Sequence, residues 1–374
     1  MHIAIIGAGI SGLLCAFEFL EQGCHVSLYD QQHFGRAASW AGGGILSPMY
    51  PWRYPDAVNQ LARHGKALYQ HYNAQLLPQT AIDFEIEHSG MLIFDADDFA
   101  IGQAYAEKYQ DPMQRCQHVQ SEQLQRINPR LAATWQQALY FPALSNIRNP
   151  RVLQSLQAYV QQHPRAQVYP QHTIQQFKMR GQRIDAAITQ HNEQIYADHF
   201  VLATGAWSAE WEQQLRCHIP VAPVQGQMLL FKTPAHWLPT MCMNDVMYLI
   251  PRRDGHIVCG SSVRHCGFDT RPDTHISAKI YAASIAMVPE LAHFPIIKQW
   301  AGLRPGSPDG IPYIGAMPEI DNLWANFGHY RNGLCMGPAA ARLLRQLLLA
   351  QQPFIDPSAY STTRLHIDQQ HIAS

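Results

Sequence analysis

The chain begins with Met1-His-Ile-Ala-Ile-Ile-Gly7-Ala-Gly9-Ile-Ser-Gly12, an apolar run that ends in a Gly-x-Gly-x-x-Gly motif. The apolar run predicts a buried parallel strand. Gly7 permits a tight turn after the strand, and Gly9 allows backbone N–H groups to approach a pyrophosphate. Gly12 allows the following helix to pack closely against the strand. These twelve residues therefore predict the start of a βαβ unit.

The residues after this motif supply the rest of the unit. A helical pattern runs from Leu13 to Leu20 and stops at Gly23, and a second apolar run closes on Asp30. A carboxylate at that place accepts hydrogen bonds from ribose hydroxyls, and the helix N-terminus puts positive partial charge beneath a pyrophosphate. The order of strand, helix, strand and acid predicts dinucleotide binding rather than an ordinary glycine turn. The residues expected to bind it are Gly7, Gly9, Ile10, Ser11, Gly12 and Asp30.

The bulk composition bounds the class of function. The 374 residues carry 27 Lys and Arg against 28 Asp and Glu, a net charge of −1, which gives no electrostatic basis for binding nucleic acid or an anionic membrane. No apolar run approaches the roughly 20 residues of a membrane helix, and the N-terminus lacks the features of a signal peptide. We expect a soluble, cytoplasmic protein with neither nucleic acid nor membrane as partner.

The cysteines show neither a disulfide framework nor a metal motif. No Cys-x-x-Cys and no His-Glu-x-x-His occurs, so no metal site is expected. Scattered spacing favours reduced, mostly buried thiols. The eight cysteines are Cys15, Cys24, Cys116, Cys217, Cys242, Cys259, Cys266 and Cys335.

Hydrophobic periodicity and turn residues place the remaining elements. The glycine-rich stretch 34–50 is expected to be a loop, 84–94 a hairpin through Ser89-Gly90, and 323–327 a strand that leads through loop 328–337 into a helix from Pro338 to Ala350. Other helices are expected at 54–76, 97–113, 150–160 and 277–287, and other strands at 167–169, 174–179, 184–189, 194–197, 200–207, 221–232, 247–251 and 256–261.

The pattern predicts an α/β protein with an α+β second domain. A discontinuous Rossmann-like domain is expected over 1–80, 145–219 and 300–374, because the last segment again pairs a strand with a helix. An interleaved antiparallel-sheet domain for the substrate is expected over 81–144 and 220–299. The sequence does not determine the oligomeric state, and a homo-oligomer is one alternative.

Two clusters in the last quarter carry arginines within glycine-rich turns. Trp300-Ala-Gly-Leu-Arg304-Pro-Gly places one arginine at the end of an apolar strand, and Gly328-His-Tyr-Arg331-Asn-Gly333 lies between a strand and the last helix. An arginine at a strand end is ordinarily a solvated surface charge. In these turns the planar guanidinium suits the binding of a carboxylate.

Five motifs in order resemble the D-amino-acid oxidase family of FAD-dependent oxidoreductases, and within it the glycine oxidases of thiamine biosynthesis. They are Gly7–Gly12 with Asp30, Ser39-Trp-Ala-Gly-Gly-Gly44, Ala203-Thr-Gly205-Ala-Trp207, Trp300-Ala-Gly-Leu-Arg304, and Gly328-His-Tyr-Arg331-Asn-Gly333. The resemblance covers Met1 to about Ala350. It implies that the Rossmann-like domain binds FAD without a covalent link.

The resemblance also assigns roles to individual residues. It implies that Arg304 grips the substrate carboxylate, that Arg331 borders the substrate, and that Tyr248 gives a hydroxyl to the same carboxylate. For Tyr248 a plain core aromatic in a strand is an equal alternative. FAD contacts are implied, beyond the fingerprint, for Gln31, Ala37, Ala38, Gly42, Gly43, Gly44, Ile174, Gly205, His329, Tyr330, Asn332, Gly333 and Leu334.

The chemistry implied by the resemblance needs few protein groups. The protein holds the substrate Cα–H against the flavin, which takes a hydride, and molecular oxygen is reduced to hydrogen peroxide. Glycine would end as glyoxylate and ammonia unless a thiazole-forming partner captures the imine. Small amines such as sarcosine and small D-amino acids are expected side substrates.

Three alternatives stay open at this point. A nicotinamide-dependent dehydrogenase shares the first thirty residues, but it leaves the C-terminal return to the same domain unexplained. A D-amino-acid or sarcosine oxidase, or a quinone-linked dehydrogenase, shares fold and flavin and differs in amine or electron acceptor. A non-catalytic flavin-binding module is the third, and Arg304, Tyr248 and Arg331 argue against it.

Overall fold

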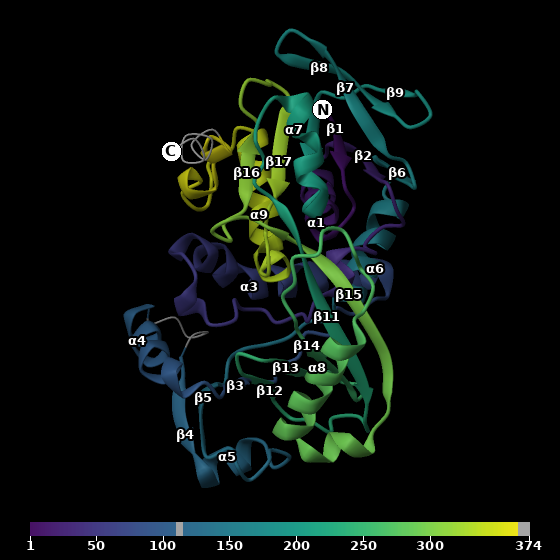
Figure 1. The fold of residues 1–374 in the computed structure, drawn as a ribbon. Coiled ribbons are helices and arrows are strands. Elements are labelled where there is room, and N and C mark those ends of the chain that lie inside the picture. The colour runs from purple at the N-terminus through teal and green to yellow at the C-terminus, as the bar shows by residue number, and fades with distance from the viewer. Residues whose placement is uncertain (110–114, 366–374) are drawn as a thin grey trace.

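The computed structural model describes residues 1–109 and 115–365 and consists of two large sheets and one small one. Figure 1 shows the first sheet in the upper half of the molecule and the second in the lower half, with the small sheet β7–β9 at the upper edge. The predicted α/β class is confirmed.

The first sheet is the Rossmann-like one. Its order is β16-β17-β10-β1-β2-β6, and all neighbours are parallel except β16 and β17. The N-terminal apolar run forms its centre, where Ile5 pairs with Leu28 on one side and Val201 on the other. The strands are β1 (His2–Ile6), β2 (His25–Asp30), β6 (Ala166–Pro170), β10 (His199–Leu202), β16 (Tyr313–Ala316) and β17 (Leu323–Phe327).

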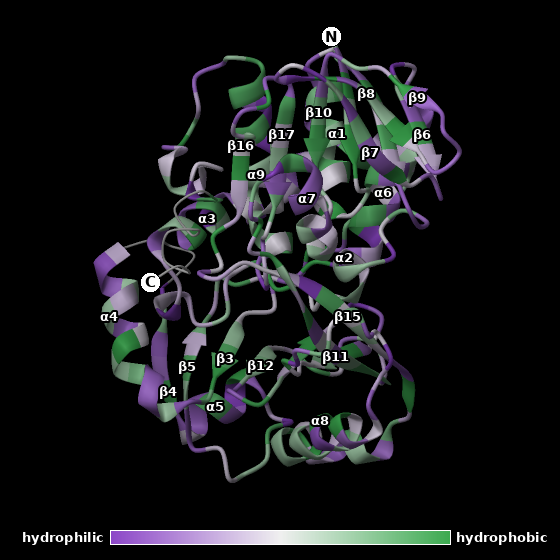
Figure 2. Cartoon of the chain, turned by 45° about the horizontal axis from the view of Figure 1, so that its top comes forward, coloured by the Kyte–Doolittle hydropathy of each residue, from purple (hydrophilic) through white to green (hydrophobic). Residues whose placement is uncertain are grey.

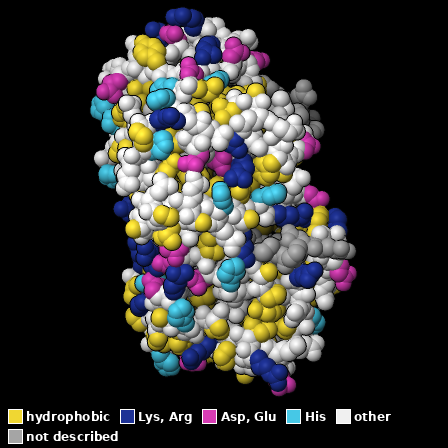
Figure 3. Space-filling model, turned by 180° about the vertical axis from the view of Figure 1, so that it is seen from behind, with side chains coloured by type: hydrophobic (Ala, Val, Ile, Leu, Met, Phe, Trp, Pro, Cys, Tyr) yellow, Lys and Arg dark blue, Asp and Glu magenta, His cyan; other side chains and the backbone are white. Residues whose placement is uncertain are grey.

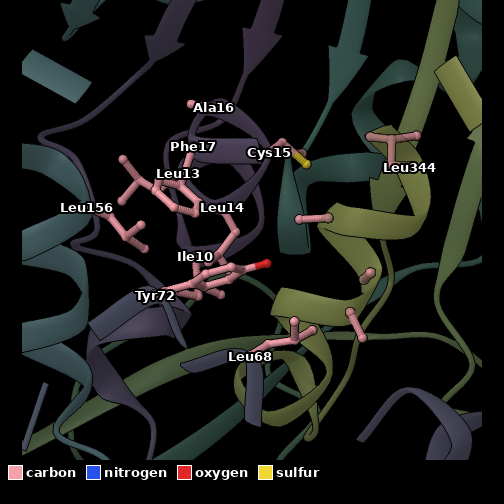
Figure 4. Close-up of a cluster of buried hydrophobic side chains, with 14 of the residues drawn as sticks. Ile10, Leu13, Leu14, Cys15, Ala16, Phe17, Leu68, Tyr72, Leu156 and Leu344 are labelled. Carbon is pink, nitrogen blue, oxygen red and sulfur yellow. The ribbon is translucent and has the colours of Figure 1, made fainter. Parts of the chain in front are cut away.

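Four helices pack together on one face of this sheet: α1 (Ile10–Glu21), α3 (Asp56–Thr80), α6 (Asn149–Gln162) and α9 (Gly333–Leu348). Figure 4 shows Leu13, Phe17 and Tyr72 turned toward one another within this core, and the Phe17 and Tyr72 rings meet edge to face at 4.8 Å. Helix α1 is buried almost all round, because it is enclosed by the sheet and its neighbours.

The other face of the first sheet is covered by smaller elements. They are β7 (Ile174–Arg180), β8 (Arg183–Thr189), β9 (Gln194–Ile195), the 3₁₀ helix η4 (Gly205–Trp211) and α7 (Glu212–Leu215). Trp211 stacks on Phe177 of β7 at 4.7 Å. Figure 2 shows hydrophobic residues concentrated in strands β10 and β17 beneath them.

The second sheet is mainly antiparallel and has the order β15-β11-β14-β13-β12-β3-β5-β4. Helix α8 (Thr274–Met287) covers one face, and Asp273 caps it by accepting from the N–H groups of His275 and Ile276. The strands are β3 (Met91–Ile93), β4 (Gln117–Gln120), β5 (Gln137–Phe141), β11 (Ala222–Lys232), β12 (Met241–Met243), β13 (Tyr248–Pro251), β14 (His256–Gly260) and β15 (Ile296–Gly306). The remaining helices are α2 (Ala38–Ala41), α4 (Phe99–Tyr109), α5 (Ser121–Ile127) and the 3₁₀ turns η1 (Pro51–Arg53), η2 (Ala96–Asp98), η5 (Pro289–His293) and η6 (Ser358–Tyr360).

The strands of the first sheet lie within the segments predicted for the Rossmann-like domain. The strands of the second sheet lie within the segments predicted for the substrate domain, except for β15, which crosses a predicted boundary. The long strand β15 belongs to the second sheet along its whole length, so the proposed boundary at residue 300 falls inside it. Figure 1 shows β15 and β11 running together from the lower sheet up to the first sheet. This pair carries residues of the second sheet to the edge of the first.

Two local predictions are wrong. Residues 84–94 form no hairpin, because Glu87 exchanges backbone hydrogen bonds with Asn146, while β3 pairs with β5 and β12. Helix α9 begins at Gly333 instead of Pro338. Pro338 lacks the N–H that would bond to the carbonyl of Leu334, and this carbonyl instead accepts from the Tyr69 hydroxyl at 3.0 Å.

Other segments refine the expectations. The predicted loop 34–50 contains the short helix α2, and the helix predicted over 97–113 is described only for Phe99–Tyr109, with 110–114 outside the described residues. All eight cysteines are free. No helix in the described ranges is long and apolar enough to cross a membrane. Figure 3 shows basic and acidic side chains interspersed on one face of the molecule.

Candidate active site

A cavity of about 590 Å³ lies where the two large sheets meet. Its walls come from the carboxyl ends of β1, β2 and β10, from the 36–45 segment, from β11, β13 and β15, and from the start of α9. Of the predicted site residues only Gly12 is absent from the lining. Those that line the cavity are Gly7, Gly9, Ile10, Ser11, Asp30, Gln31, Ala37, Ala38, Gly42, Gly43, Gly44, Ile174, Gly205, Tyr248, Arg304, His329, Tyr330, Arg331, Asn332, Gly333 and Leu334.

The glycine turn between β1 and α1 is closed by backbone packing. Gly7 has a positive φ of 101°, and a Cβ at this position would overlap the Ala203 carbonyl of β10. A Cβ on Gly12 would overlap the Gly7 carbonyl. Gly12 therefore packs against the backbone of the turn, and it does not line the cavity. The N-terminus of the twelve-residue helix α1 therefore faces the cavity through Gly9 and Ile10.

Asp30 is fixed at the end of β2. Its carboxylate accepts from the N–H groups of Ala8 and Gln32, both at 2.7 Å. Burial raises the pKa of this carboxyl above its ordinary value, and the two backbone hydrogen bonds oppose that shift. A carboxylate offers about four lone-pair sites, so two accepted bonds leave acceptor capacity toward the cavity.

The glycine segment 42–44 is held by residues that the sequence did not single out. Arg252 is buried and donates to the carbonyls of Gly43 (2.6 Å) and Ile147 (2.9 Å) and to Oδ1 of Asn146 (2.5 Å). None of these partners is a carboxylate, and burial lowers the pKa of Arg252 to about 10. Asn149 adds a bond from Nδ2 to the Ser39 carbonyl at 3.0 Å.

Arg304 lies at the other end of the cavity, on β15. Nη1 donates to the Ser262 carbonyl at 3.1 Å and Nη2 to Oγ of Ser261 at 2.7 Å. Burial lowers the pKa of this guanidinium, and neighbouring Arg331 lowers it further. Both partners are neutral, so Arg304 places a partly buried positive charge in the cavity wall without a carboxylate partner among the described residues.

Tyr248 and Arg331 complete this end of the cavity. The Tyr248 hydroxyl donates to Sδ of Met228 at 3.4 Å, and it lies 3.1 Å from where a Cβ on Gly43 would stand. Nε of Arg331 is buried without a hydrogen-bond partner within the described part of the chain. Met49 also lines the cavity, whereas Tyr50 points elsewhere and donates to Asp95.

His329 stands just before α9 and is fully buried. Nε2 bonds to Oδ1 of Asn326 at 2.9 Å, and since that oxygen only accepts, Nε2 carries the proton. Burial lowers the pKa of His329 to about 4, so the ring is neutral at pH 7. Nδ1 is buried and has no partner among the described residues, so it is an unsatisfied acceptor.

Several residues of this site were missed in the sequence analysis. Ser39 was quoted within a motif without a role, and its Oγ accepts from the Ile10 N–H at 2.8 Å. Arg252, Asn149 and Ser261 gave no local signal, because nothing in a sequence shows which charged or polar residue will be buried. Met228 also gave none, since a methionine in an apolar strand is ordinarily core.

Comparison with known proteins agrees with this geometry. The sequence profile of the DAO family, described as FAD dependent oxidoreductase, matches residues 2–347. The chain is 42% identical to a glycine oxidase of Pseudomonas aeruginosa and 39% identical to one of Pseudomonas putida, over 96% of this chain and 98% of each relative.

Two more distant matches extend over nearly the whole of this chain. A bifunctional protein ThiO/ThiG of Synechocystis is 27% identical over 96% of this chain and 54% of its own length. The crystal structure of glycine oxidase from Geobacillus kaustophilus superposes with a TM-score of 0.91 at 24% identity, covering 97% of this chain and 98% of that one. The chain therefore belongs to the DAO family of FAD-dependent oxidoreductases.

Proposed function

We propose that this FAD-dependent amine oxidase acts on glycine and passes the electrons to molecular oxygen, giving glyoxylate, ammonia and hydrogen peroxide. The observation that carries the proposal is Arg304, a partly buried guanidinium in the cavity wall whose described hydrogen-bond partners are both neutral. A charge that is partly withdrawn from water is costly unless an opposite charge pairs with it. A substrate carboxylate supplies that charge and is held by two N–H groups at once.

The residues of the other end fit FAD. The N-terminus of α1, the tight turn at Gly7 and the acceptor Asp30 meet the needs of a pyrophosphate and a ribose. Nδ1 of His329 is a buried acceptor without a partner in the described part of the chain, and the first N–H groups of a helix have no partner within it. His329, Gly333 and Leu334 all line the cavity. We assign FAD to this part of the cavity and the amine to the part beside Arg304.

The protein's own residues bind and orient the substrate. Arg304 forms the main contact with the carboxylate, Tyr248 donates its hydroxyl to it, and Arg331 adds positive charge on the side of α9. Bound FAD supplies the two-electron acceptor for the hydride that leaves the substrate Cα. With the carboxylate fixed at one point, the Cα–H is oriented without a general base, and catalysis depends chiefly on this positioning.

The small substrate follows from the kinds of side chain in the wall. The cavity lining includes Met49, Met228 and Tyr248 together with Arg304 and Arg331. Gly226 and Ser261 lie against the Arg304 guanidinium, and neither is an acidic or basic receptor for a larger amino acid side chain. Excluding one methyl group is worth only about 1–3 kcal/mol, so sarcosine and small D-amino acids are side substrates.

We further propose that the imine product serves a thiazole-forming partner in thiamine biosynthesis. The support is the similarity to a bifunctional protein ThiO/ThiG, in which this chain corresponds to about half of the relative. Without that partner the imine is hydrolysed in water to glyoxylate and ammonia.

The test is a substrate survey with purified holoenzyme. Peroxide formation and oxygen uptake are measured for glycine, sarcosine, D-alanine and a bulky D-amino acid. We expect glycine to be oxidised with kcat/KM comparable to or above the others. The proposal fails if kcat/KM for glycine is orders of magnitude below that of the bulky D-amino acid, or if no amine gives peroxide.

A further inference from the structure

The thioether of Met228 lies in the cavity wall beside the Tyr248 hydroxyl. Met228 belongs to β11 and keeps only 2% of its surface accessible, yet its side chain lines the cavity. Its sulfur occupies the space left by the missing side chain of Gly260, because a Cβ on that glycine would overlap Sδ. The sulfur accepts the Tyr248 hydroxyl at 3.4 Å.

A thioether is a nucleophile that hydrogen peroxide oxidises, and the proposed reaction releases peroxide into this cavity. We propose that Met228 is a modification site at which the enzyme's own product forms methionine sulfoxide. One oxygen atom passes from peroxide to Sδ and the other leaves as water, so the peroxide is reduced and the sulfur is oxidised by two electrons. This inference rests on the proposed function, because peroxide is its oxidant.

Oxidation of Met228 changes the strength of the group that accepts the Tyr248 hydroxyl. A thioether sulfur is a weak acceptor, so substrate carboxylate competes well for the Tyr248 hydroxyl. A sulfoxide oxygen is polar and accepts strongly, and it holds the hydroxyl away from the carboxylate. Arg304 keeps its own contacts with Ser261 and Ser262, so the modified enzyme still binds substrate, with a KM several-fold higher and a smaller change in kcat.

The chain provides internal controls for where the peroxide comes from. Met179 on β7 is 42% exposed and does not line the cavity, so it reports peroxide in bulk solution. Met49 lines the cavity, whereas the Tyr248 hydroxyl donates to Met228, so Met49 reports peroxide in the cavity without the effect on substrate binding. Met228 differs from both because it lies in the cavity wall and also accepts the Tyr248 hydroxyl.

The experiment compares methionine oxidation by peroxide formed in the cavity with methionine oxidation by peroxide added to the solution. Holoenzyme is turned over with glycine in the presence of excess catalase, and a second sample receives added peroxide without glycine. Peptide mass spectrometry measures the gain of one oxygen at each methionine. We expect Met228 to be oxidised in proportion to turnovers under catalase while Met179 stays intact, and Met179 to be oxidised first by added peroxide.

Kinetics of two matched variants test the consequence. In Met49→Leu, KM for glycine rises during turnover as it does in the wild type; in Met228→Leu, KM stays at that variant's own starting value. An enzyme that forms peroxide but leaves Met228 unmodified, or modifies it only together with Met179, overturns the inference and leaves the proposed function standing. Absence of peroxide with every amine overturns both.

Discussion

Gly226 on β11 lies directly beneath the guanidinium of Arg304 on β15, so that a Cβ at residue 226 would overlap Cζ and both terminal nitrogens. The two strands are antiparallel neighbours, and Val224 is the residue paired with Arg304. The absence of a side chain at residue 226 is therefore what lets the guanidinium lie across the strand and reach Ser261 and Ser262.

Substitution of Gly226 by alanine should displace Arg304 and raise KM for glycine by at least tenfold, which corresponds to about 1.4 kcal/mol. FAD content should be unchanged, because Gly226 belongs to the substrate end of the cavity. The control is a double-mutant cycle with Arg304→Ala: once the guanidinium is gone, Gly226→Ala should add little to KM. Full additivity of the two effects would show that Gly226 acts on something other than Arg304.

Removal of the Arg304 side chain should weaken substrate binding by roughly 2–5 kcal/mol, the cost of truncating one partner of a buried charge pair. Arg304→Lys should restore only part of this loss, because an ammonium cannot present two N–H groups in one plane. Steady-state KM for glycine measures both effects, and Arg271→Ala, an exposed arginine paired with Asp269, is the control. A near-normal KM in Arg304→Ala would transfer the role to Arg331.

His329 should make the folded protein sensitive to mild acid. Its pKa is lowered from 6.5 to about 4 in the fold, so below pH 6.5 the unfolded chain binds a proton that the folded chain does not. The free energy of unfolding is therefore unaffected by the protonation of His329 above pH 6.5, and it decreases by about 3 kcal/mol in total as the pH falls from 6.5 to 4. Urea unfolding of wild type and His329→Gln across this range should show a shallower pH dependence in the variant.

The wild type, measured in the same buffers, is the control for this prediction, because the two proteins differ only at residue 329. If His329→Gln has the same slope as the wild type between pH 6.5 and 4, the buried ring is not responsible for the acid sensitivity.

Arg252 should support FAD binding without touching the substrate. Arg252→Met removes the bonds to Gly43, Ile147 and Asn146, and each acceptor left buried and unpaired costs about 1–3 kcal/mol. We expect weaker FAD binding, measured by titration of the apoprotein, and lower thermal stability. Arg253→Met is the neighbouring control, since that side chain is half exposed in ion pairs with Asp83 and Glu87. Equal FAD affinity in the two variants would contradict the assignment.

FAD should be bound without a covalent link. The family resemblance implies that relatives with a covalently bound flavin carry the linking cysteine shortly after the position of Arg304. In this chain the residues from Arg304 to Gly315 contain no cysteine. Acid precipitation of the holoenzyme should therefore release the yellow colour into the supernatant. Colour that stays with the pelleted protein would disprove this.

The order of motifs along the chain was enough to predict the first sheet and its turn. Local rules govern this region: a buried parallel strand needs a continuous apolar run, and the turn after it needs Gly7 and Gly12, where any side chain would overlap backbone. The start of α9 was misplaced for an equally physical reason. A proline normally favours a first turn, but the Tyr69 hydroxyl satisfies the carbonyl that Pro338 leaves free, and Tyr69 lies far away in the sequence.

The sequence by itself therefore determined the class of fold, the dinucleotide turn and the arginines that face the cavity. Only the tertiary structure decided which groups hold them in place: Arg252 behind Gly43, Gly226 beneath Arg304, and Met228 beside Tyr248. Spacing along the chain reflects local backbone geometry. Burial and contact between distant strands depend on how the two sheets pack, and that packing sets the energy of each buried charge and each hydrogen bond in the cavity.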